Sequence, residues 1–245
     1  MNWNELMYLL KYETSVDVIN NRKDEIAQLI PAIKDMFDYD QCSQYHQYDL
    51  WLHCVHTVLE LPRGIEDDML YLAALLHDIG KPSSRCKGKK ENDPYAHYYG
   101  HPVISKQIVI NEVIPYLKSI SISLSDDAKK RLLYYVEYHD DRVSLRIKHL
   151  RRHLQIVPLE TFKKLMLLEV ADAKAHIIDE RIQERIYICS TWSSGYAEEL
   201  IQNDNVIEKV PANYSERIKT AKSLFGILPP EADILEAKEE RLSMK

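Results

Sequence analysis

LAALLHDIGKP, residues 72–82, is the segment of this sequence that carries most information about fold and function. An apolar run ends in the adjacent pair His77-Asp78, and a glycine and a proline follow shortly afterwards. This pattern predicts a buried helix over 66–77 that ends at the pair. Adjacent helical residues differ in direction by about 100°, so both can reach one ion only near a helix end. An imidazole and a carboxylate at such a position suit a divalent ion such as Mn, Fe, Co, Ni or Zn.

Composition favours a soluble helical protein. The chain has 245 residues, of which 45% are apolar and 29% charged, and only six are glycine, which favours an all-α fold. The net charge of -6 means that the surface as a whole does not attract nucleic acid. Four cysteines without a CxxC pair, no secretory signal and no apolar run long enough for a bilayer indicate a cytoplasmic protein without a membrane partner.

Helical periodicity and capping residues predict a series of helices. They cover residues 3–12, a segment from Ser15 that Pro31 interrupts, 49–61, 66–77, 102–118, 125–139, 144–154, and 158–176 with an extension towards 190. Two weaker helices are expected within 211–245, Pro158 is expected as the first residue of its helix, and 38–48 and 81–100 are expected as loops. No stretch predicts a sheet.

Two further residues fit a metal site. His53 and Asp172 each lie on a predicted helix with a strongly apolar face. A charged aspartate within LLEVADAKA (167–175) is costly to bury unless it is paired, hydrogen-bonded or bound to metal. A lone buried histidine is more often an ordinary core residue, whereas a histidine-aspartate pair at a helix end indicates a ligand set.

Four segments carry a family resemblance: QCSQYHQYDLWLHCVHTV (41–58), LAALLHDIGKP (72–82), HYYGHPVIS (97–105) and LRRHLQIVPLETFKKLMLLEVADAKA (150–175). In this order they resemble the HD-domain superfamily of metal-dependent phosphohydrolases, and most closely the HD region of bacterial tRNA nucleotidyltransferases (CCA-adding enzymes). The nucleotidyltransferase head has no counterpart before residue 30, so CCA addition is not expected. The resemblance implies an HD-domain helical bundle over 33–190, with an N-terminal helical extension (1–32) and additional C-terminal helices in a tail (191–245) that packs on the HD domain.

The resemblance also implies the metal ligands. His53, His77, Asp78 and Asp172 match the family's ligand pattern, and His101 and His139 fall where members with a fuller set add histidines. The implied cofactor is one or two divalent ions (Mn, Ni, Co, Fe, Mg or Zn). Leu52 stands where an acidic residue commonly precedes the first histidine, so His53 is expected to lack that hydrogen-bond partner.

The implied activity is hydrolysis of a phosphomonoester or phosphodiester by attack of metal-bound hydroxide. A nucleotide, a cyclic nucleotide or an RNA end is the expected substrate. Asp78 is assigned as ligand and proton acceptor, and Lys81 and Arg142 as phosphate-binding cations, with Lys81 at the mouth of the site. An exposed lysine that interacts with helix-end carbonyls is the alternative for Lys81.

Other basic and aromatic residues leave two interpretations open. The basic loop of Arg85, Lys87, Lys89 and Lys90 either steers phosphates or is a solvated loop, and the basic segment 142–152 either contacts RNA or is a charged helix face. His56 is expected in the core, and the loop residues His46 and His97 rank below the six ligands. Two other functions remain open: a non-catalytic nucleotide- or RNA-binding HD module, and a trans-acting partner of a tRNA nucleotidyltransferase. The sequence does not predict the oligomeric state.

Overall fold

A computed structural model describes residues 1–88 and 93–204. The chain divides into two compact units, Met1–Ala197 and Glu198–Lys245. Of the second unit, only 198–204 are described, and they form most of α13 (Tyr196–Asp204). The helices expected within 211–245, the packing of the tail, and the roles of Lys89 and Lys90 lie outside the described residues.

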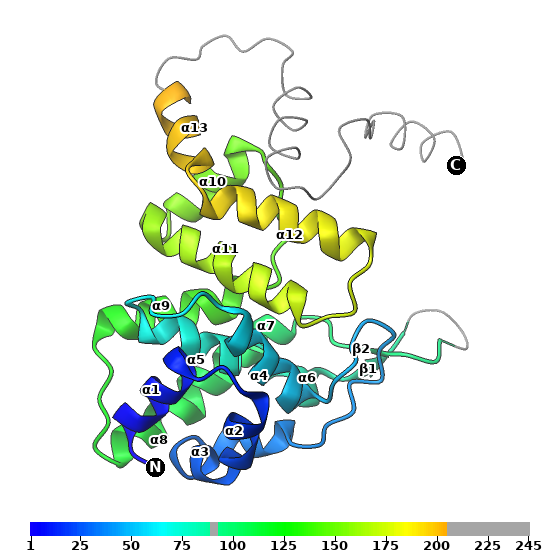
Figure 1. Cartoon of the computed structure of the whole chain (residues 1–245), viewed down its shortest axis with the longest axis vertical. Helices are drawn as coiled ribbons and strands as arrows, with labels where there is room; N and C mark the ends of the chain where they lie inside the picture. Colours follow the sequence, from blue (N-terminus) through cyan, green and yellow to red (C-terminus); the bar gives the residue numbers. More distant parts are fainter. Residues whose placement is uncertain (89–92, 205–245) are drawn as a thin grey trace. The chain divides into compact units, whose positions relative to one another are not determined.

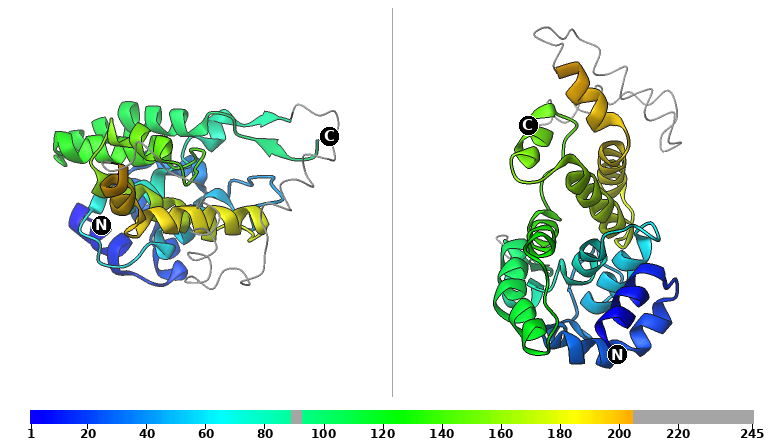
Figure 2. Two further views of the ribbon diagram at one scale, coloured as in Figure 1. Left: turned by 90° about the horizontal axis from the view of Figure 1, so that it is seen from above. Right: turned by 90° about the vertical axis from the view of Figure 1, so that its left-hand side faces the viewer.

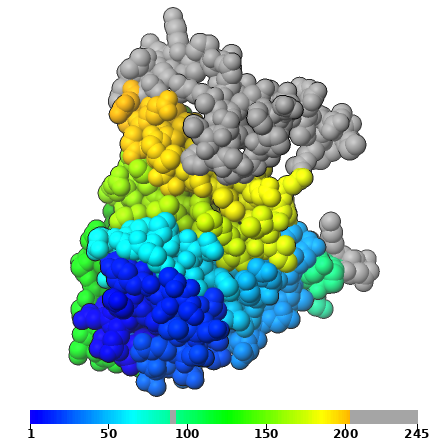
Figure 3. Space-filling view, viewed as in Figure 1, coloured from blue at the N-terminus to red at the C-terminus, as the bar shows by residue number. Residues whose placement is uncertain are grey.

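The first unit begins with a layer of short helices: α1 (Trp3–Tyr12), α2 (Val16–Asn21), α3 (Lys23–Leu29) and the 3-10 helix η1 (Pro31–Met36). The buried side chains of α1 pack against α4 and α5, and α2 packs against α4. In the space-filling view, these N-terminal residues form one continuous surface with the helices that follow (Figure 3). The N-terminal segment therefore belongs to the same compact unit as the rest of Met1–Ala197.

The core is centred on α5 (Asp68–Leu76), whose residues from Met69 to Leu76 are all buried. Helices α1, α4, α9 and α11 surround it (Figure 1). Helix α4 (Leu50–Glu60) begins at Asp49, whose carboxylate accepts a hydrogen bond from a backbone N–H of the first turn. The expected helices over 49–61 and 66–77 are thus confirmed, and so is the irregular segment 38–48.

One long helical run follows, and then α9. The run consists of α7 (His101–Ile108), a π-helical segment η2 (Val109–Val113) and α8 (Ile114–Ser119). Pro115, which has no N–H to continue the α-helical pattern, accounts for the change in hydrogen bonding. Helix α9 (Asp126–Tyr138) begins at the predicted cap Ser125 and packs against α5 and α7.

Helices α10 (Ile147–Leu154), α11 (Leu159–Lys174) and α12 (Glu180–Ser193) complete this unit (Figure 1). Two expectations were wrong here. Pro158 is the N-cap of α11 rather than its first residue. Helix α11 does not continue towards 190, because the Asp179 carboxylate caps a new helix by accepting a hydrogen bond from the Ile182 N–H.

The segment 81–100 is also more ordered than expected. It contains α6 (Lys81–Ser84) and an antiparallel pair of short strands, β1 (Cys86–Lys87) and β2 (Ala96–His97), which project from the helices (Figure 2). The expectation of no sheet was therefore wrong, though only for two residues in each strand. Overall, the predicted all-α fold with helices beyond the bundle is confirmed. No helix in the described part of the chain is long and apolar enough to cross a membrane.

Candidate metal centre

The ends of several helices bring the six predicted ligands together. His77 and His139 follow the last residues of α5 and α9, and His101 begins α7. His53 comes from the first turns of α4, and Asp172 from the last turn of α11. The structure buries all six, which we call the metal centre: His53, His77, Asp78, His101, His139 and Asp172.

Gly80 allows this convergence. A Cβ atom at this position would lie 2.5 Å from the backbone N of Ser105 on α7. Only glycine therefore lets the turn after Asp78 lie so close to α7, the helix that carries His101. The Gly80 N–H donates to the Ser105 hydroxyl oxygen at 2.9 Å and holds the two segments together.

Four ligand atoms form the first half of the centre. Asp78 Oδ2 lies 3.4 Å from His53 Nε2 and 3.2 Å from His77 Nε2. Asp172 Oδ1 lies 3.0 Å and 3.4 Å from the same two nitrogens. Ligands about 2.1 Å from a tetrahedral ion are about 3.4 Å apart. His53, His77 and Asp172 therefore present three ligand atoms close enough together to hold one divalent ion, and Asp78 Oδ2 lies beside both histidines.

The second half of the centre uses the other oxygen of Asp78. Asp78 Oδ1 lies 3.0 Å from His101 Nε2 and 3.4 Å from His139 Nε2, and these two nitrogens are 3.1 Å apart. The two oxygens of one carboxylate thus face two different pairs of histidines. This arrangement offers Asp78 as a bridge between two ions.

Backbone contacts fix the orientation of three imidazole rings. In His77, His101 and His139, Nδ1 is hydrogen-bonded at 2.8–2.9 Å to the carbonyl oxygen three residues earlier. For His77 and His139 this carbonyl lies in the last turn of a helix, where carbonyls have no partner within the helix. Because Nδ1–H donates to the backbone, the lone pair on Nε2 points into the centre.

Several atoms of the centre lack a hydrogen-bond partner among the described residues: His53 Nδ1 and Nε2, His77 Nε2, Asp78 Oδ1 and Asp172 Oδ1. Unsatisfied polar atoms cost about 1–3 kcal/mol each when buried. His53 Nδ1 has no hydrogen-bond partner among the described residues, as expected with Leu52 in place of an acidic residue. Imidazole nitrogens and carboxylate oxygens suit a transition-metal ion, so the centre fits the implied cofactor.

Lys81 contributes a positive charge on one side of the centre. Its Nζ lies 2.6 Å from Asp78 Oδ2, 2.8 Å from Gln41 Oε1 and 3.2 Å from His46 Nε2. Lys81 is buried rather than exposed at a mouth. Burial acts to raise the pKa of Asp78, but Lys81 and His77 hold this pKa well below its usual value. Burial also acts to raise the pKa of Asp172. His176 and His53 nevertheless hold this pKa well below its usual value.

A cavity of about 870 Å³ lies against the centre. It is lined by Asp78, Lys81, His101, His139 and Asp172 together with the segments 43–46 and 93–100. His97, which ranked below the main ligands, lines this cavity and pairs with Asp93 at 2.9 Å. The cavity has the size of an ordinary small-molecule site.

Two residues expected near the site or in the core lie elsewhere. Arg142 is exposed and does not line the cavity, so the structure does not bring it to the centre with Lys81. His56 is only partly buried, and its ring stacks on Tyr48 with centroids 3.9 Å apart.

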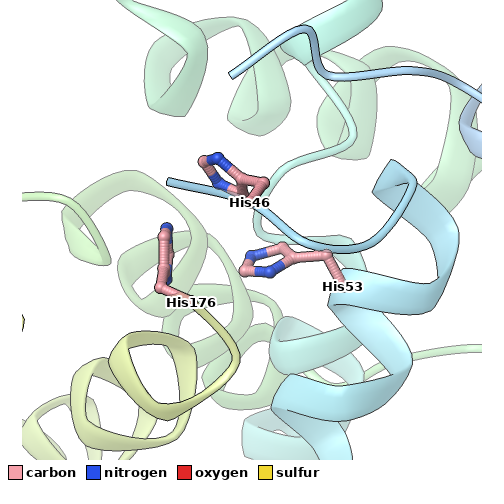
Figure 4. A group of neighbouring side chains, drawn as sticks. All are labelled: His46, His53 and His176. Carbon is pink, nitrogen blue, oxygen red and sulfur yellow. The ribbon is translucent and has the colours of Figure 1, made fainter. Parts of the chain in front are cut away.

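Two further histidines, His46 and His176, line the cavity. His176 was not singled out and His46 ranked low, yet both rings lie beside His53 (Figure 4). The ring centroids of His46 and His176 are 4.4 Å apart, and His176 Nδ1 lies 3.7 Å from Asp172 Oδ1. The spacing of four residues between Asp172 and His176 at a helix end is the signal that could have identified His176.

Comparison with known proteins agrees with this geometry. The HD domain model matches residues 45–175, more than half of the chain. This chain belongs to the HD domain family. The HD domain here carries buried histidine and aspartate groups able to hold metal ions, as in the metal-dependent phosphohydrolase superfamily. No curated protein matches the chain.

Proposed function

We propose that this HD domain is a phosphohydrolase that requires two divalent ions and cleaves a phosphomonoester or a phosphodiester. The bridging position of Asp78 supports this proposal: Oδ2 faces His53 and His77, and Oδ1 faces His101 and His139. His53, His77 and Asp172 would complete the site of one ion, and His101 and His139 that of the other. Divalent ions bound there would polarise a phosphoryl oxygen and supply a nucleophile at neutral pH.

The residues around the centre suit a phosphate group. The Lys81 ammonium group is already held at the cavity wall by Gln41 and Asp78, where it would balance charge on a transferring phosphoryl group. Burial lowers the pKa of His46 and of His176, so both imidazoles are neutral at pH 7. Neutral imidazoles on the cavity wall can donate or accept a hydrogen bond at an oxygen of the substrate.

A nucleotide, a cyclic nucleotide or an RNA end is the substrate class we propose. The cavity is large enough for a nucleotide, and the rings of Tyr45 and Tyr98 contribute to its wall, where a base could stack. The narrower likeness to the HD region of tRNA nucleotidyltransferases is supported only by the sequence segments that suggested it. Copurification with a nucleotidyltransferase would test the related proposal that the chain acts in trans.

The experiment is an activity screen on the full chain after treatment with chelator and removal of the chelator. Phosphomonoesters, phosphodiesters, 2′,3′-cyclic nucleotides and short RNAs with defined ends would be offered with Mn, Ni, Co, Fe, Mg or Zn. We expect hydrolysis of at least one class that depends on added metal. His101→Gln should abolish it, whereas His56→Gln, outside the centre, should behave as the parent chain.

Two results of this screen would contradict the proposed function. No turnover of any class with any metal would overturn the proposed function. RNA binding that is unchanged by chelator and by the His101→Gln substitution would instead identify the chain as a non-catalytic binding module.

A further inference from the structure

A second group of histidine and aspartate side chains lies outside the metal centre. Asp141 follows α9, and His149 and His153 lie one turn apart on α10. Both histidines are buried, at 7% and 0% exposure. We call these three residues the α10 cluster. The proposed hydrolase activity makes no use of it.

The three side chains converge on one atom of their own chain. Arg152 Nη2 lies 3.3 Å from His149 Nδ1 and 3.3 Å from His153 Nε2, and it forms a very short contact with Asp141 Oδ2. One Nη2 atom carries two hydrogens, so it cannot donate a linear hydrogen bond to three acceptors at once. Three lone pairs directed at one point are what a metal ion satisfies and an arginine nitrogen does not.

The orientations of the rings agree with a ligand role. His153 Nδ1 is hydrogen-bonded to the Tyr134 hydroxyl at 2.8 Å, which leaves Nε2 to face Asp141 at 3.4 Å. The remaining nitrogen of His149, Nε2, is buried without a hydrogen-bond partner among the described residues. If Nε2 carries the hydrogen, the lone pair on Nδ1 points towards Arg152.

We infer that the α10 cluster is a second metal site, for zinc or a similar divalent ion, and that the Arg152 guanidinium occupies it when no ion is bound. Two imidazole nitrogens and one carboxylate oxygen are a common ligand set for zinc, with solvent as the fourth ligand. The separation of 3.4 Å between His153 Nε2 and Asp141 Oδ2 matches the edge of such a tetrahedron, about 3.4 Å for bonds of about 2.1 Å. Histidines four residues apart on one helix can face the same ion.

Arg152 is able to leave the cluster. Its side chain is 50% exposed, so the guanidinium can turn into solvent without being buried elsewhere. The two imidazole ligands stay in place, because the rings of His149 and His153 pack against Phe162 on α11. An ion there would link the loop after α9 to α10. It would also compete with Arg152, so the affinity would be lower than in an empty site of the same shape.

Zn(II) and Co(II) titrations of the chelator-treated full chain test this inference. We expect the parent chain to bind one equivalent of Zn(II) more than the His153→Gln variant, and Co(II) to give a tetrahedral absorption spectrum that His153→Gln and Asp141→Asn both reduce. Arg152→Ala should bind the extra equivalent on the order of tenfold more tightly, because competition from the guanidinium is removed. Arg151→Ala, the exposed neighbour, is the matched control and should bind as the parent chain does.

The outcomes separate this site from the metal centre. Equal equivalents in the parent chain, His153→Gln and Asp141→Asn would overturn the inference, provided that circular dichroism shows all three folded. Weaker binding in Arg152→Ala would overturn the part assigned to the guanidinium. Because the readout is bound metal, the result does not depend on finding a substrate.

Discussion

The metal centre and the α10 cluster contain the same kinds of ligand atom, imidazole nitrogens and carboxylate oxygens, but they differ in the cation that contacts these atoms. The centre collects six residues from α4, α5, α7, α9 and α11 and from the turn at Asp78. The α10 cluster takes two histidines from one helix and an aspartate that is eight residues earlier. Lys81 contacts one oxygen of Asp78 in the metal centre, whereas Arg152 reaches all three members of the α10 cluster.

The difference indicates how strongly each site depends on an external ion. In the centre, Lys81 contacts Asp78 Oδ2, and several nitrogens and oxygens are left without hydrogen bonds. In the α10 cluster, Arg152 supplies a charge that neutralises Asp141. We therefore expect the metal centre to depend more strongly on a bound ion than the α10 cluster, where Arg152 already balances the charge of Asp141. Variants that break one site and spare the other test this contrast.

The largest effect is expected for Asp78→Asn. Because Asp78 faces both halves of the centre, its loss should weaken both ion sites and lower phosphohydrolase kcat/KM on the order of 10³-fold, about 4 kcal/mol of transition-state stabilisation. Asp141→Asn removes the carboxylate of the α10 cluster and should leave kcat/KM unchanged. Steady-state kinetics at saturating metal measures both. Equal losses in the two variants would mean that the clusters are not functionally separate.

A somewhat smaller effect is expected for Lys81→Met in the absence of metal. Lys81 and Asp78 form a buried ion pair at 2.6 Å, and removing one partner leaves a buried charge, which costs about 3 kcal/mol. Urea unfolding in chelator should show this loss, and added divalent metal should restore most of it by replacing the missing charge. Lys106→Met, which breaks the half-exposed pair with Glu137, is the control and should cost less than about 1 kcal/mol. A destabilisation that metal does not reduce would contradict the proposed link between Lys81 and the ion.

The α10 cluster predicts a pH effect on the stability of the metal-free chain. Burial lowers the pKa of His149 to about 4 and that of His153 to about 4. The unfolded chain, with histidine pKa values near 6.5, binds these protons more readily than the folded chain. The stability that the two neutral imidazoles contribute is therefore present above about pH 6.5, and it is lost as the pH falls towards 4.

The measurement compares the parent chain with His149→Gln/His153→Gln. Urea unfolding in chelator at several pH values from 7 to 4 should show a smaller loss of stability in the double variant. The nearby charges of Arg152 and Asp141 are present in both chains, so the difference isolates the histidines. An identical pH dependence would show that the two imidazoles are not buried as neutral groups.

Local signals explain why most helix boundaries were predictable from the sequence. Asp49 and Ser125 each accept a hydrogen bond from a backbone N–H three residues later, an interaction that a short sequence window contains in full. The break after α11 was missed because Asp179, an aspartate inside a helical pattern, acts as a cap only once the chain has turned. The β1–β2 pair has two residues in each strand, too few for any alternation to be visible.

Prediction of the site was limited in the same way. The adjacent residues His77 and Asp78 predicted a metal site from the sequence. Which histidines each oxygen of Asp78 faces depends on the packing of α7 and α9, which the sequence does not show. His46 lies on an irregular segment, where no periodicity marks a functional face. The α10 cluster was hidden in a basic segment, because the sequence does not reveal that the guanidinium of the partly exposed Arg152 turns towards His149 and Asp141.

The smallest effect is expected for Arg142→Ala. The sequence made Arg142 a candidate phosphate ligand beside Lys81, but in the structure it is exposed and does not line the cavity. An exposed side chain without such a contact changes stability by less than about 0.5 kcal/mol, and we expect KM and kcat to stay at the parent values. A raised KM at unchanged kcat would mean that the loop after α9 moves Arg142 to the substrate during binding. That result would extend the catalytic region towards the α10 cluster and would end the functional separation between the two clusters.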